Sequence, residues 1–339
     1  MLAGLVLFCT TFCLSDGEGH LVGKSYDWDM EQGMVIANPR GLHKRALLLG
    51  GGRPAEWDAK YASVTFNQYG REMPNGGMNE AGLVVEVMWL DETVTPPADR
   101  RPAVGELQWI QMQLDTRGTV AEMVRAADKV RVAPIGGKVH YMACDATGAC
   151  AVFENLGGKM VVTAGRDLSS KVLTNDTYRA SASALTAHAG FGGKKGIPRG
   201  AGSLERFVRA AALVARSAGQ KPERKTALAV LDSVRNGAYT KWNIVYDPVA
   251  RRIAFRTRSR PALKEIDLAA LATSCKASAR MLDMATSARG DVTGTFKNYT
   301  FAANKKLVET SLAPIADTLP PGTAWIAASY PATSRCRAR

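Results

Sequence analysis

The sequence lacks several features that would point to a common class of protein. Aromatic residues make up only 7% of its 339 residues, and no run after residue 15 is long and apolar enough to span a bilayer. No Gly-x-Ser-x-Gly turn is present, which argues against an α/β-hydrolase. The glycine-rich stretch at 190–196 has no Ser or Thr after its lysines, so it lacks the hydroxyl of a phosphate-binding loop. These absences argue against a membrane protein and against a nucleotide-binding one.

Histidine is also scarce, and the histidines are far apart in the sequence. The four are His20, His43, His140 and His188. Neither His-Glu-x-x-His nor the paired Cys and His spacing of a zinc site occurs. We therefore predict no metal site.

The charge is strongly positive but scattered. Lys and Arg number 44 against 31 Asp and Glu, a formal net charge of +13. No aromatic-interleaved basic stripe or known nucleic-acid signature accompanies these charges. We therefore expect a solvated basic surface with no nucleic-acid or membrane partner, and a basic polyanion-binding protein is the non-enzymatic alternative.

The cysteines offer two pairings. The six are Cys9, Cys13, Cys144, Cys150, Cys275 and Cys336. Residues 144 and 150 bracket a turn between two strand-like runs, so their sulfurs are predicted to face each other across a hairpin; residues 275 and 336 would pair at long range. Such pairing suits a periplasmic or secreted protein. Buried thiols in a reducing, cytoplasmic location are the alternative.

Residues 1–8 precede a cysteine in a way that suggests processing. They resemble the apolar part of a signal peptide but have no positive n-region, so they are predicted to be a leader, a propeptide or a truncated signal remnant. The alternative is an ordinary first β-strand over residues 2–14. If residues 1–8 are removed, Cys9 carries both a nucleophilic thiol and a free α-amine able to accept its proton. Residues 9–339 are predicted to form one catalytic domain.

The predicted elements alternate between hairpins and pairs of helices, which favours an α+β fold over a parallel βαβ sheet. Residues 9–15 and 20–28 form a predicted hairpin around the turn at 16–19. The other predicted strands are 34–37, 63–69, 83–90, a hairpin over 139–154, 160–163, 172–174, a hairpin over 241–257, and 293–303. The predicted helices are 106–114, 120–130, 178–187, 204–215, 226–234 and 307–316.

Six segments in order carry a family resemblance. They are Cys9, Gly23–Trp28, Pro39–Gly41, Gly77–Leu83, Leu173–Asn175 and Arg206–Arg209. On these residues the chain resembles the choloylglycine hydrolase and penicillin V acylase family, cysteine members of the N-terminal-nucleophile (Ntn) hydrolases that cleave linear amide C–N bonds. The resemblance implies an αββα four-layer sandwich with antiparallel sheets. Family members are often tetramers, which implies a homo-oligomer.

The resemblance also implies the catalytic roles. Cys9 would be the nucleophile, and Asp27 would face it across the hairpin and hold its amine. Asn175 would donate to the oxyanion, although an Asn at the end of a strand also fits a helix cap. Arg206 would stabilise the thiolate or orient Asp27. Lys24 stands where the family usually has Arg, which keeps the charge but loses the planar fork.

The expected activity is amide hydrolysis through a thioester, without a metal or cofactor. Trp89 stands where bile salt hydrolases typically carry Asn and penicillin V acylases tend to have Tyr, so its backbone N–H would serve the oxyanion and its ring would shape an apolar pocket. This favours apolar or aryl acyl amides, such as penicillin V or N-acyl homoserine lactones. The alternatives are a bile salt hydrolase and an acyltransferase that uses the same nucleophile.

Overall fold

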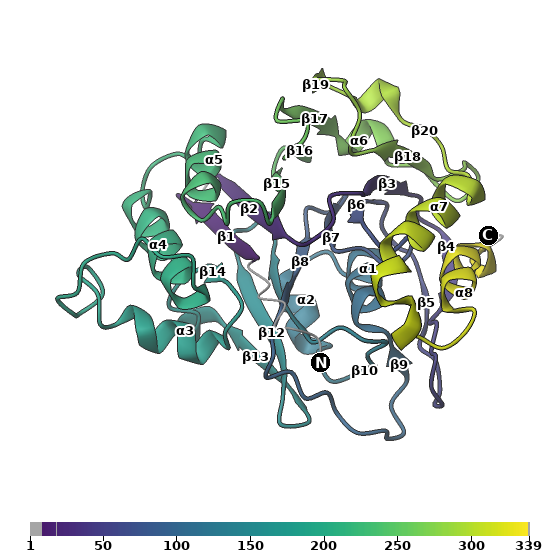
Figure 1. Ribbon diagram of the computed structural model, residues 1–339, viewed down its shortest axis with the longest axis horizontal. Coiled ribbons are helices and arrows are strands. Elements are labelled where there is room, and N and C mark those ends of the chain that lie inside the picture. Colours follow the sequence, from purple (N-terminus) through teal and green to yellow (C-terminus); the bar gives the residue numbers. More distant parts are fainter. Residues whose placement is uncertain (1–8, 18, 338–339) are drawn as a thin grey trace.

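Two large β-sheets face each other in the computed structural model, which describes residues 9–17 and 19–337. Within this part of the chain the first sheet is seven-stranded and contains the N-terminal hairpin (Figure 1). In spatial order its strands are β14 (Val172–Leu173), β1 (Thr10–Ser15), β2 (His20–Asp27), β15 (Thr240–Asp247), β16 (Arg252–Thr257), β17 (Lys264–Asp267) and β19 (Gly290–Asp291).

The second sheet is nine-stranded over the same residues. In spatial order its strands are β13 (Lys159–Ala164), β12 (Cys150–Leu156), β11 (Val139–Cys144), β8 (Val84–Trp89), β7 (Gly76–Asn79), β6 (Ser63–Asn67), β3 (Met34–Asn38), β18 (Arg280–Asp283) and β20 (Lys297–Asn298). Among the described strands of the two large sheets, neighbours run antiparallel except for the short β17–β19 pair. The predicted antiparallel character is confirmed.

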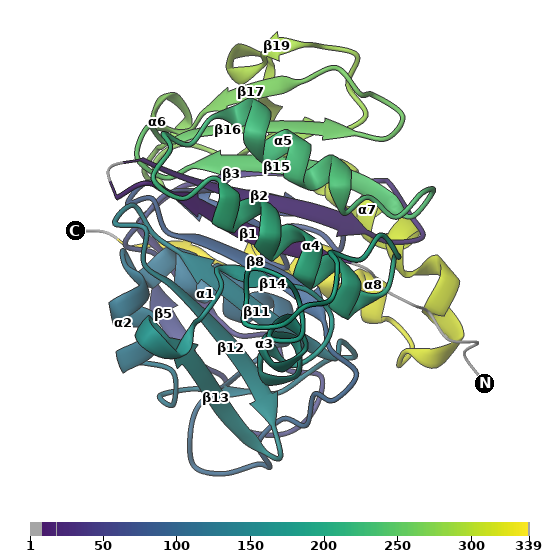
Figure 2. The same ribbon diagram turned by 90° about the vertical axis from the view of Figure 1, so that its left-hand side faces the viewer.

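Helices cover the outer faces of both sheets. Helices α3 (Tyr178–Leu185), α4 (Ser203–Arg216) and α5 (Arg224–Ser233) lie over the first sheet; α1 (Glu106–Thr116) and α2 (Val120–Arg125) lie over the second (Figures 1 and 2). The remaining helices are α6 (Leu268–Leu271), α7 (Phe301–Leu312) and α8 (Thr323–Ser329). Helix, sheet, sheet and helix are therefore stacked as four layers, which confirms the predicted αββα sandwich.

One predicted element is wrong. Residues 293–303, predicted as a strand, contain a 3₁₀ turn (Thr293–Thr295), the short strand β20 and the start of α7 at Phe301. The hydroxyl of Thr300 accepts the backbone N–H of Ala303 and caps this helix. The β-branched and aromatic residues of the segment are typical of a strand, but the cap starts a helix at Phe301, six residues before the predicted 307.

The N-terminal hairpin forms as the sequence predicts. Strands β1 and β2 pair in the register Thr11 with Lys24 and Phe12 with Gly23. A Cβ atom on Gly23 would lie 2.2 Å from the Phe12 ring, so only glycine permits this close approach. Because side chains alternate along a strand, Lys24 and the neighbouring Ser25 point to opposite faces of the sheet.

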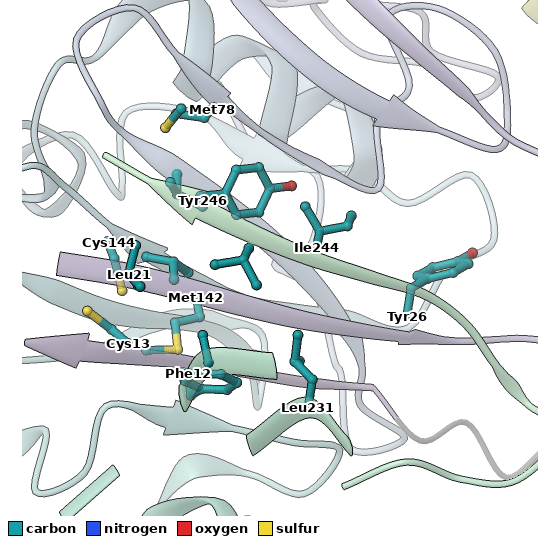
Figure 3. Close-up of a cluster of buried hydrophobic side chains, with 14 of the residues drawn as sticks. Phe12, Cys13, Leu21, Tyr26, Met78, Met142, Cys144, Leu231, Ile244 and Tyr246 are labelled. Carbon is teal, nitrogen blue, oxygen red and sulfur yellow. The ribbon is translucent and has the colours of Figure 1, made fainter. Parts of the chain in front are cut away.

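The largest cluster of buried apolar side chains includes inward-facing residues of both sheets and residues of α4 and α5. Figure 3 shows part of this cluster, with Cys13 of β1 near Cys144 of β11. A second cluster fills the space between the second sheet and helices α1 and α2. The N-terminal hairpin is therefore held from both sides, and the chain around Cys9 is fixed by the core.

Both predicted disulfides are present. Cys144 pairs with Cys150 across the β11–β12 hairpin, and Cys275 pairs with Cys336. The alternative of buried free thiols holds only for Cys9 and Cys13 among the described cysteines. The second disulfide lies beside a small sheet of β21 (Arg335–Cys336), β4 (Leu42–Arg45) and β5 (Glu56–Asp58); a further pair joins β9 (Ala103–Val104) to β10 (Arg131–Val132).

Two further predictions concern the leader at residues 1–8 and the absence of a segment that spans a membrane. The predicted leader at residues 1–8 lies outside the described residues, and strand β1 starts at Thr10. Within residues 9–17 and 19–337, the helices are too short or too polar to cross a bilayer.

Candidate active site

Cys9 lies directly before β1 and is buried, with 4% of its surface exposed. Its Sγ contacts the backbone carbonyl oxygen of Asp27, 3.8 Å away at the end of β2. Burial raises the pKa of the Cys9 thiol, and the Lys24 ammonium is the strongest of the influences that lower it again. The hairpin therefore brings Cys9, Asp27 and Lys24 close enough for their charges to act on one another.

The Asp27 carboxylate is buried at the end of β2 and only half satisfied. Its Oδ1 accepts the Ser25 hydroxyl at 2.9 Å, while Oδ2 has no hydrogen-bond partner among the described residues. Burial raises the pKa of Asp27 to about 6, against the opposing effects of the nearby Thr240 hydroxyl and the Arg206 charge. An unpartnered carboxylate oxygen next to Cys9 is suited to accept a hydrogen bond from an ammonium group.

Arg206, in the first turn of α4, ties the nucleophile to the rest of the site. It is fully buried, and its Nη1 donates to the Cys9 carbonyl oxygen and to the Thr10 hydroxyl, each at 2.7 Å. Its Nη2 donates to Asn175 Oδ1 at 2.8 Å, and its Nε donates to the Ala201 carbonyl at 3.0 Å. Burial lowers the pKa of Arg206 to about 10, which leaves the guanidinium charged at neutral pH. One planar group thus holds two elements in a fixed geometry.

Asn175 follows β14 and projects into the same cluster. Its Nδ2 donates to the Trp89 carbonyl oxygen at 2.9 Å, and its backbone N–H donates to the Ser203 hydroxyl at 2.8 Å. The helix-cap alternative is wrong, because the hydroxyl of Thr177 accepts the N–H of Ala180 and caps α3. The Asn175 side-chain amide is therefore not used as a helix cap and can take part in the active site.

Lys24 points into the space between the two sheets, on the opposite face of β2 from Ser25. Its Nζ donates to the Val87 carbonyl and lies 3.3 Å from Met88 Sδ and 3.7 Å from Glu86 Oε2. All three acceptors belong to β8. The lysine that replaces the family arginine is therefore anchored to the second sheet.

Aromatic rings gather at the ends of β2 and β8. Trp28 and Trp89 are half-buried, with ring centroids 6.5 Å apart and an interplanar angle of 47°. Tyr26 stacks on Trp242 with centroids 4.2 Å apart. The Trp89 indole N–H donates to Asp91 at 2.7 Å, which orients its ring. This aromatic wall adjoins Asn175 through the Trp89 carbonyl.

Two participants were not singled out from the sequence. Trp28 lies inside a matching segment, but nothing in the sequence pairs it with Trp89. Glu86 contacts Lys24, and its signal is a lone acidic residue within the otherwise apolar strand β8.

The potential metal ligands lie elsewhere. Within residues 9–17 and 19–337, three sulfurs gather within 4.8 Å of one another, those of Cys13, Cys144 and Cys150. Two of them, Cys144 and Cys150, form a disulfide, and Cys13 is a free thiol. The chemistry available at Cys9 is that of a thiol, a carboxylate, an amide and two cations.

Comparison with known proteins agrees with this arrangement. A family model described as linear amide C–N hydrolases, choloylglycine hydrolase family, matches residues 9–276. Penicillin V acylase from Pectobacterium atrosepticum is 26% identical over 311 residues, which cover 77% of this chain and 81% of that protein.

Solved structures with the same fold are also known. Penicillin V acylase from Agrobacterium tumefaciens has a TM-score of 0.77 at 25% identity, covering 86% of this chain and 98% of that one. A variant of conjugated bile acid hydrolase from Clostridium perfringens has a TM-score of 0.68 at 17% identity, covering 81% and 97%. The protein described here is therefore a hydrolase of the choloylglycine hydrolase family, with the Ntn-hydrolase fold and activity on linear amide C–N bonds.

Proposed function

We propose that the protein is a cysteine-dependent amidohydrolase of the penicillin V acylase type. The observation that carries the proposal is the position of the Arg206 guanidinium. It binds the Cys9 carbonyl oxygen, the Thr10 hydroxyl and the Asn175 amide at once. A buried cation that fixes a thiol-bearing residue beside an amide donor is suited to acyl transfer.

Removal of residues 1–8 is the first step of the proposed mechanism. It frees the Cys9 α-amine, which accepts the thiol proton directly or through water. The family match begins at residue 9, which supports this step. The unpartnered Oδ2 of Asp27 is the proposed acceptor for the resulting ammonium.

The thiolate then attacks the amide carbonyl carbon and forms a tetrahedral intermediate. The Asn175 Nδ2 hydrogen not bound to the Trp89 carbonyl, together with the backbone N–H near Trp89, stabilises the oxyanion. The C–N bond breaks as the Cys9 ammonium protonates the departing amine. Water, deprotonated by the same amine, hydrolyses the thioester and returns the thiol.

The proposed acyl group is apolar or aryl. The half-buried Trp28 and Trp89 rings favour a flat acyl group over a bulky steroid, because an aromatic acyl group can stack on them. Penicillin V and N-acyl homoserine lactones meet this description. The two disulfides support a periplasmic or secreted location for the enzyme.

The mechanism is tested on purified protein whose first residue is determined by mass spectrometry. We expect active protein to begin at Cys9, and Cys9→Ala to be inactive. A Cys13→Ala control keeps the processing site and removes the other free thiol, so it should retain activity. Active protein that still begins at Met1 would refute the role of the amine.

The substrate is tested with a panel of matched amides. Phenoxyacetyl, fatty-acyl and conjugated bile acid substrates are compared by kcat/KM, with phenoxyacetyl expected to be hydrolysed fastest. A bile salt hydrolase would reverse this order. Addition of an amine acceptor identifies an acyltransferase, because the acylated amine would then replace the free acid as product.

A further inference from the structure

Lys24 is buried in an unusual place for a lysine. Only 1% of its surface is exposed, between strands β2 and β8. Its ammonium has a backbone carbonyl, a thioether sulfur and one carboxylate as neighbours. A buried ammonium keeps its charge only when a partner compensates for the lost hydration. The carboxylate is that of Glu86.

Glu86 is itself held from several sides. Its Oε1 accepts the Tyr246 hydroxyl at 2.5 Å, and its Oε2 lies 3.7 Å from Lys24 Nζ. A Cβ atom on Gly76, its partner on β7, would lie 2.3 Å from the carboxylate, so only glycine leaves room for it. Four strands thus contribute to one buried ion pair: β2, β15, β7 and β8 itself.

The pair is connected to the nucleophile through the N-terminal hairpin. Lys24 lies opposite Thr11, two residues after Cys9, and of the charged groups near Cys9 it has the largest effect in lowering the pKa of the thiol. The titratable groups that face Glu86 are Lys24 and Tyr26 from β2 and Tyr246 from β15. Its sheet neighbours opposite, Gly76 on β7 and Met142 on β11, carry no titratable group.

We propose that Glu86 is a positioning residue for catalysis, which holds the Lys24 ammonium against β8 so that its field acts on the Cys9 thiol. The proposal rests on the function proposed above and adds a residue to it. It also explains how a lysine serves where the family usually has an arginine. Arginine can bind several acceptors at once through its planar fork, whereas a lysine depends more on a single partner to hold its ammonium in place.

Loss of the carboxylate should therefore weaken the hold on the lysine. In Glu86→Gln the Lys24 side chain stays buried without its carboxylate partner, so nothing of opposite charge keeps its ammonium in place against β8. The Cys9 thiolate then loses the cation that stabilises it most, so the pKa of the thiol should rise, and we expect about tenfold less thiolate at neutral pH. In the wild type, burial raises the pKa of Glu86 to about 7, so protonation of this carboxylate should contribute to the fall in activity on the acid side of the pH profile. This contribution should be absent in Glu86→Gln.

The test measures the pH dependence of Cys9 alkylation by iodoacetamide in processed protein. A Cys13→Ala background restricts the reaction to Cys9, and thermal unfolding verifies that each variant is folded. We compare Glu86→Gln, Lys24→Met and the double variant. The readout requires no substrate, so it remains informative if the enzyme proves inactive on every amide and the proposed function fails.

A shared mechanism has a distinct signature. Each single variant should alkylate about tenfold more slowly at pH 7, and the double variant should be no slower than Lys24→Met alone. The double variant should also be more stable than Glu86→Gln, because it has no buried lysine without a carboxylate partner. An unchanged or faster alkylation in Glu86→Gln, or losses that multiply in the double variant, would overturn the proposal.

Two further variants guard against misfolding and general destabilisation. Tyr246→Phe keeps both charges but removes a hydrogen bond to Glu86, so the acid limb of the alkylation profile should move to higher pH; an unmoved limb would contradict the proposal.

Glu72→Gln is the matched control, because Glu72 is a buried partner of another lysine, Lys44, at 2.5 Å. It should lower stability without moving the Cys9 profile, and a shift there would show that any buried ion pair has this effect.

Discussion

Arg206 donates from Nη2 to the Oδ1 of Asn175 at 2.8 Å, and this contact determines which way the amide faces. With Oδ1 occupied as an acceptor, Nδ2 must face the Trp89 carbonyl, where it donates at 2.9 Å. The same guanidinium holds the Cys9 carbonyl oxygen. The distance between nucleophile and amide donor is therefore set by one side chain.

Arg206→Lys should lower kcat strongly with a smaller effect on KM. A lysine keeps the positive charge but cannot bind Cys9, Thr10 and Asn175 together. We expect a loss of about 100-fold, the order seen when a positioned donor in an acyl-transfer site is lost. Steady-state kinetics on penicillin V measures it.

Arg209→Lys on the same helix is the matched control for this change. Arg209 binds the backbone carbonyls of Ser233, Pro198 and Gly200 and does not touch the nucleophile. Its loss should affect stability and leave kcat near the wild-type value. Equal losses of kcat in the two variants would mean that Arg206 acts only through the packing of α4.

Asn175→Ala should lower kcat by about 100-fold or more, because the oxyanion loses a donor that acts in the transition state. Substrate binding should change little. Thr177→Ala provides the contrast, since Thr177 caps α3 and its loss should lower stability by about 1 kcal/mol with kcat retained. Kinetics and urea unfolding of both variants separate the two roles. If Thr177→Ala lost kcat and Asn175→Ala kept it, Asn175 would not be the oxyanion donor.

Asp27→Asn should make the unprocessed protein more stable and the processed enzyme less active at neutral pH. Burial raises the pKa of Asp27 from its ordinary value of 3.8 to about 6, so the folded protein holds the proton more tightly than the unfolded chain. The wild type therefore loses stability as the pH rises between these values, and the loss is complete above about pH 6. The shift corresponds to about 3 kcal/mol at most.

The measurement is urea unfolding of wild type and Asp27→Asn between pH 4 and pH 8, a range that runs from near the ordinary pKa of 3.8 to above the raised pKa of about 6. The variant's advantage should be small at the acid end and reach its full size above pH 6. A constant difference would show that Asp27 does not titrate in the folded state. Activity should fall at every pH, because the asparagine cannot bind the Cys9 ammonium as a charge.

Much of the site could be predicted because its members lie in short segments with strong local patterns. Cys9, Lys24 and Asp27 share one hairpin, and the turn at residues 16–19 fixes which strand pairs with which. Asn175 and Arg206 are far away in the sequence, so only the resemblance to a family connected them to Cys9. The structure adds the bond between them.

The parts that could not be predicted depend on contacts between sheets. Glu86 meets Lys24 only because β8 of the second sheet faces β2 of the first, and periodicity within one strand carries no information about the facing sheet. The same holds for Trp28 and Trp89. The misplaced start of α7 has a local cause, since a single threonine cap outweighs the strand preference of its neighbours.

Cys150→Ser should redirect a disulfide toward the nucleophile strand. The sulfurs of Cys13, Cys144 and Cys150 lie within 4.8 Å of one another, so loss of Cys150 leaves Cys144 beside the Cys13 thiol. In the wild type, burial raises the pKa of Cys13 to about 12, which keeps this thiol out of exchange with the native disulfide. Oxidative refolding of Cys150→Ser with oxidised glutathione should give a Cys13–Cys144 bond.

Peptide mass mapping without reduction identifies the new bond, and a Cys9→Ala background removes the other thiol of the same tryptic peptide. The double variant Cys13→Ala/Cys150→Ser should leave Cys144 free, which controls for pairing with glutathione or with another chain. Because the new bond would join β1 to β11, it would link the two sheets covalently and should raise the thermal midpoint above that of the double variant. If Cys144 stays reduced with Cys13 present, the two sulfurs do not approach closely enough in solution for the exchange that this packing predicts.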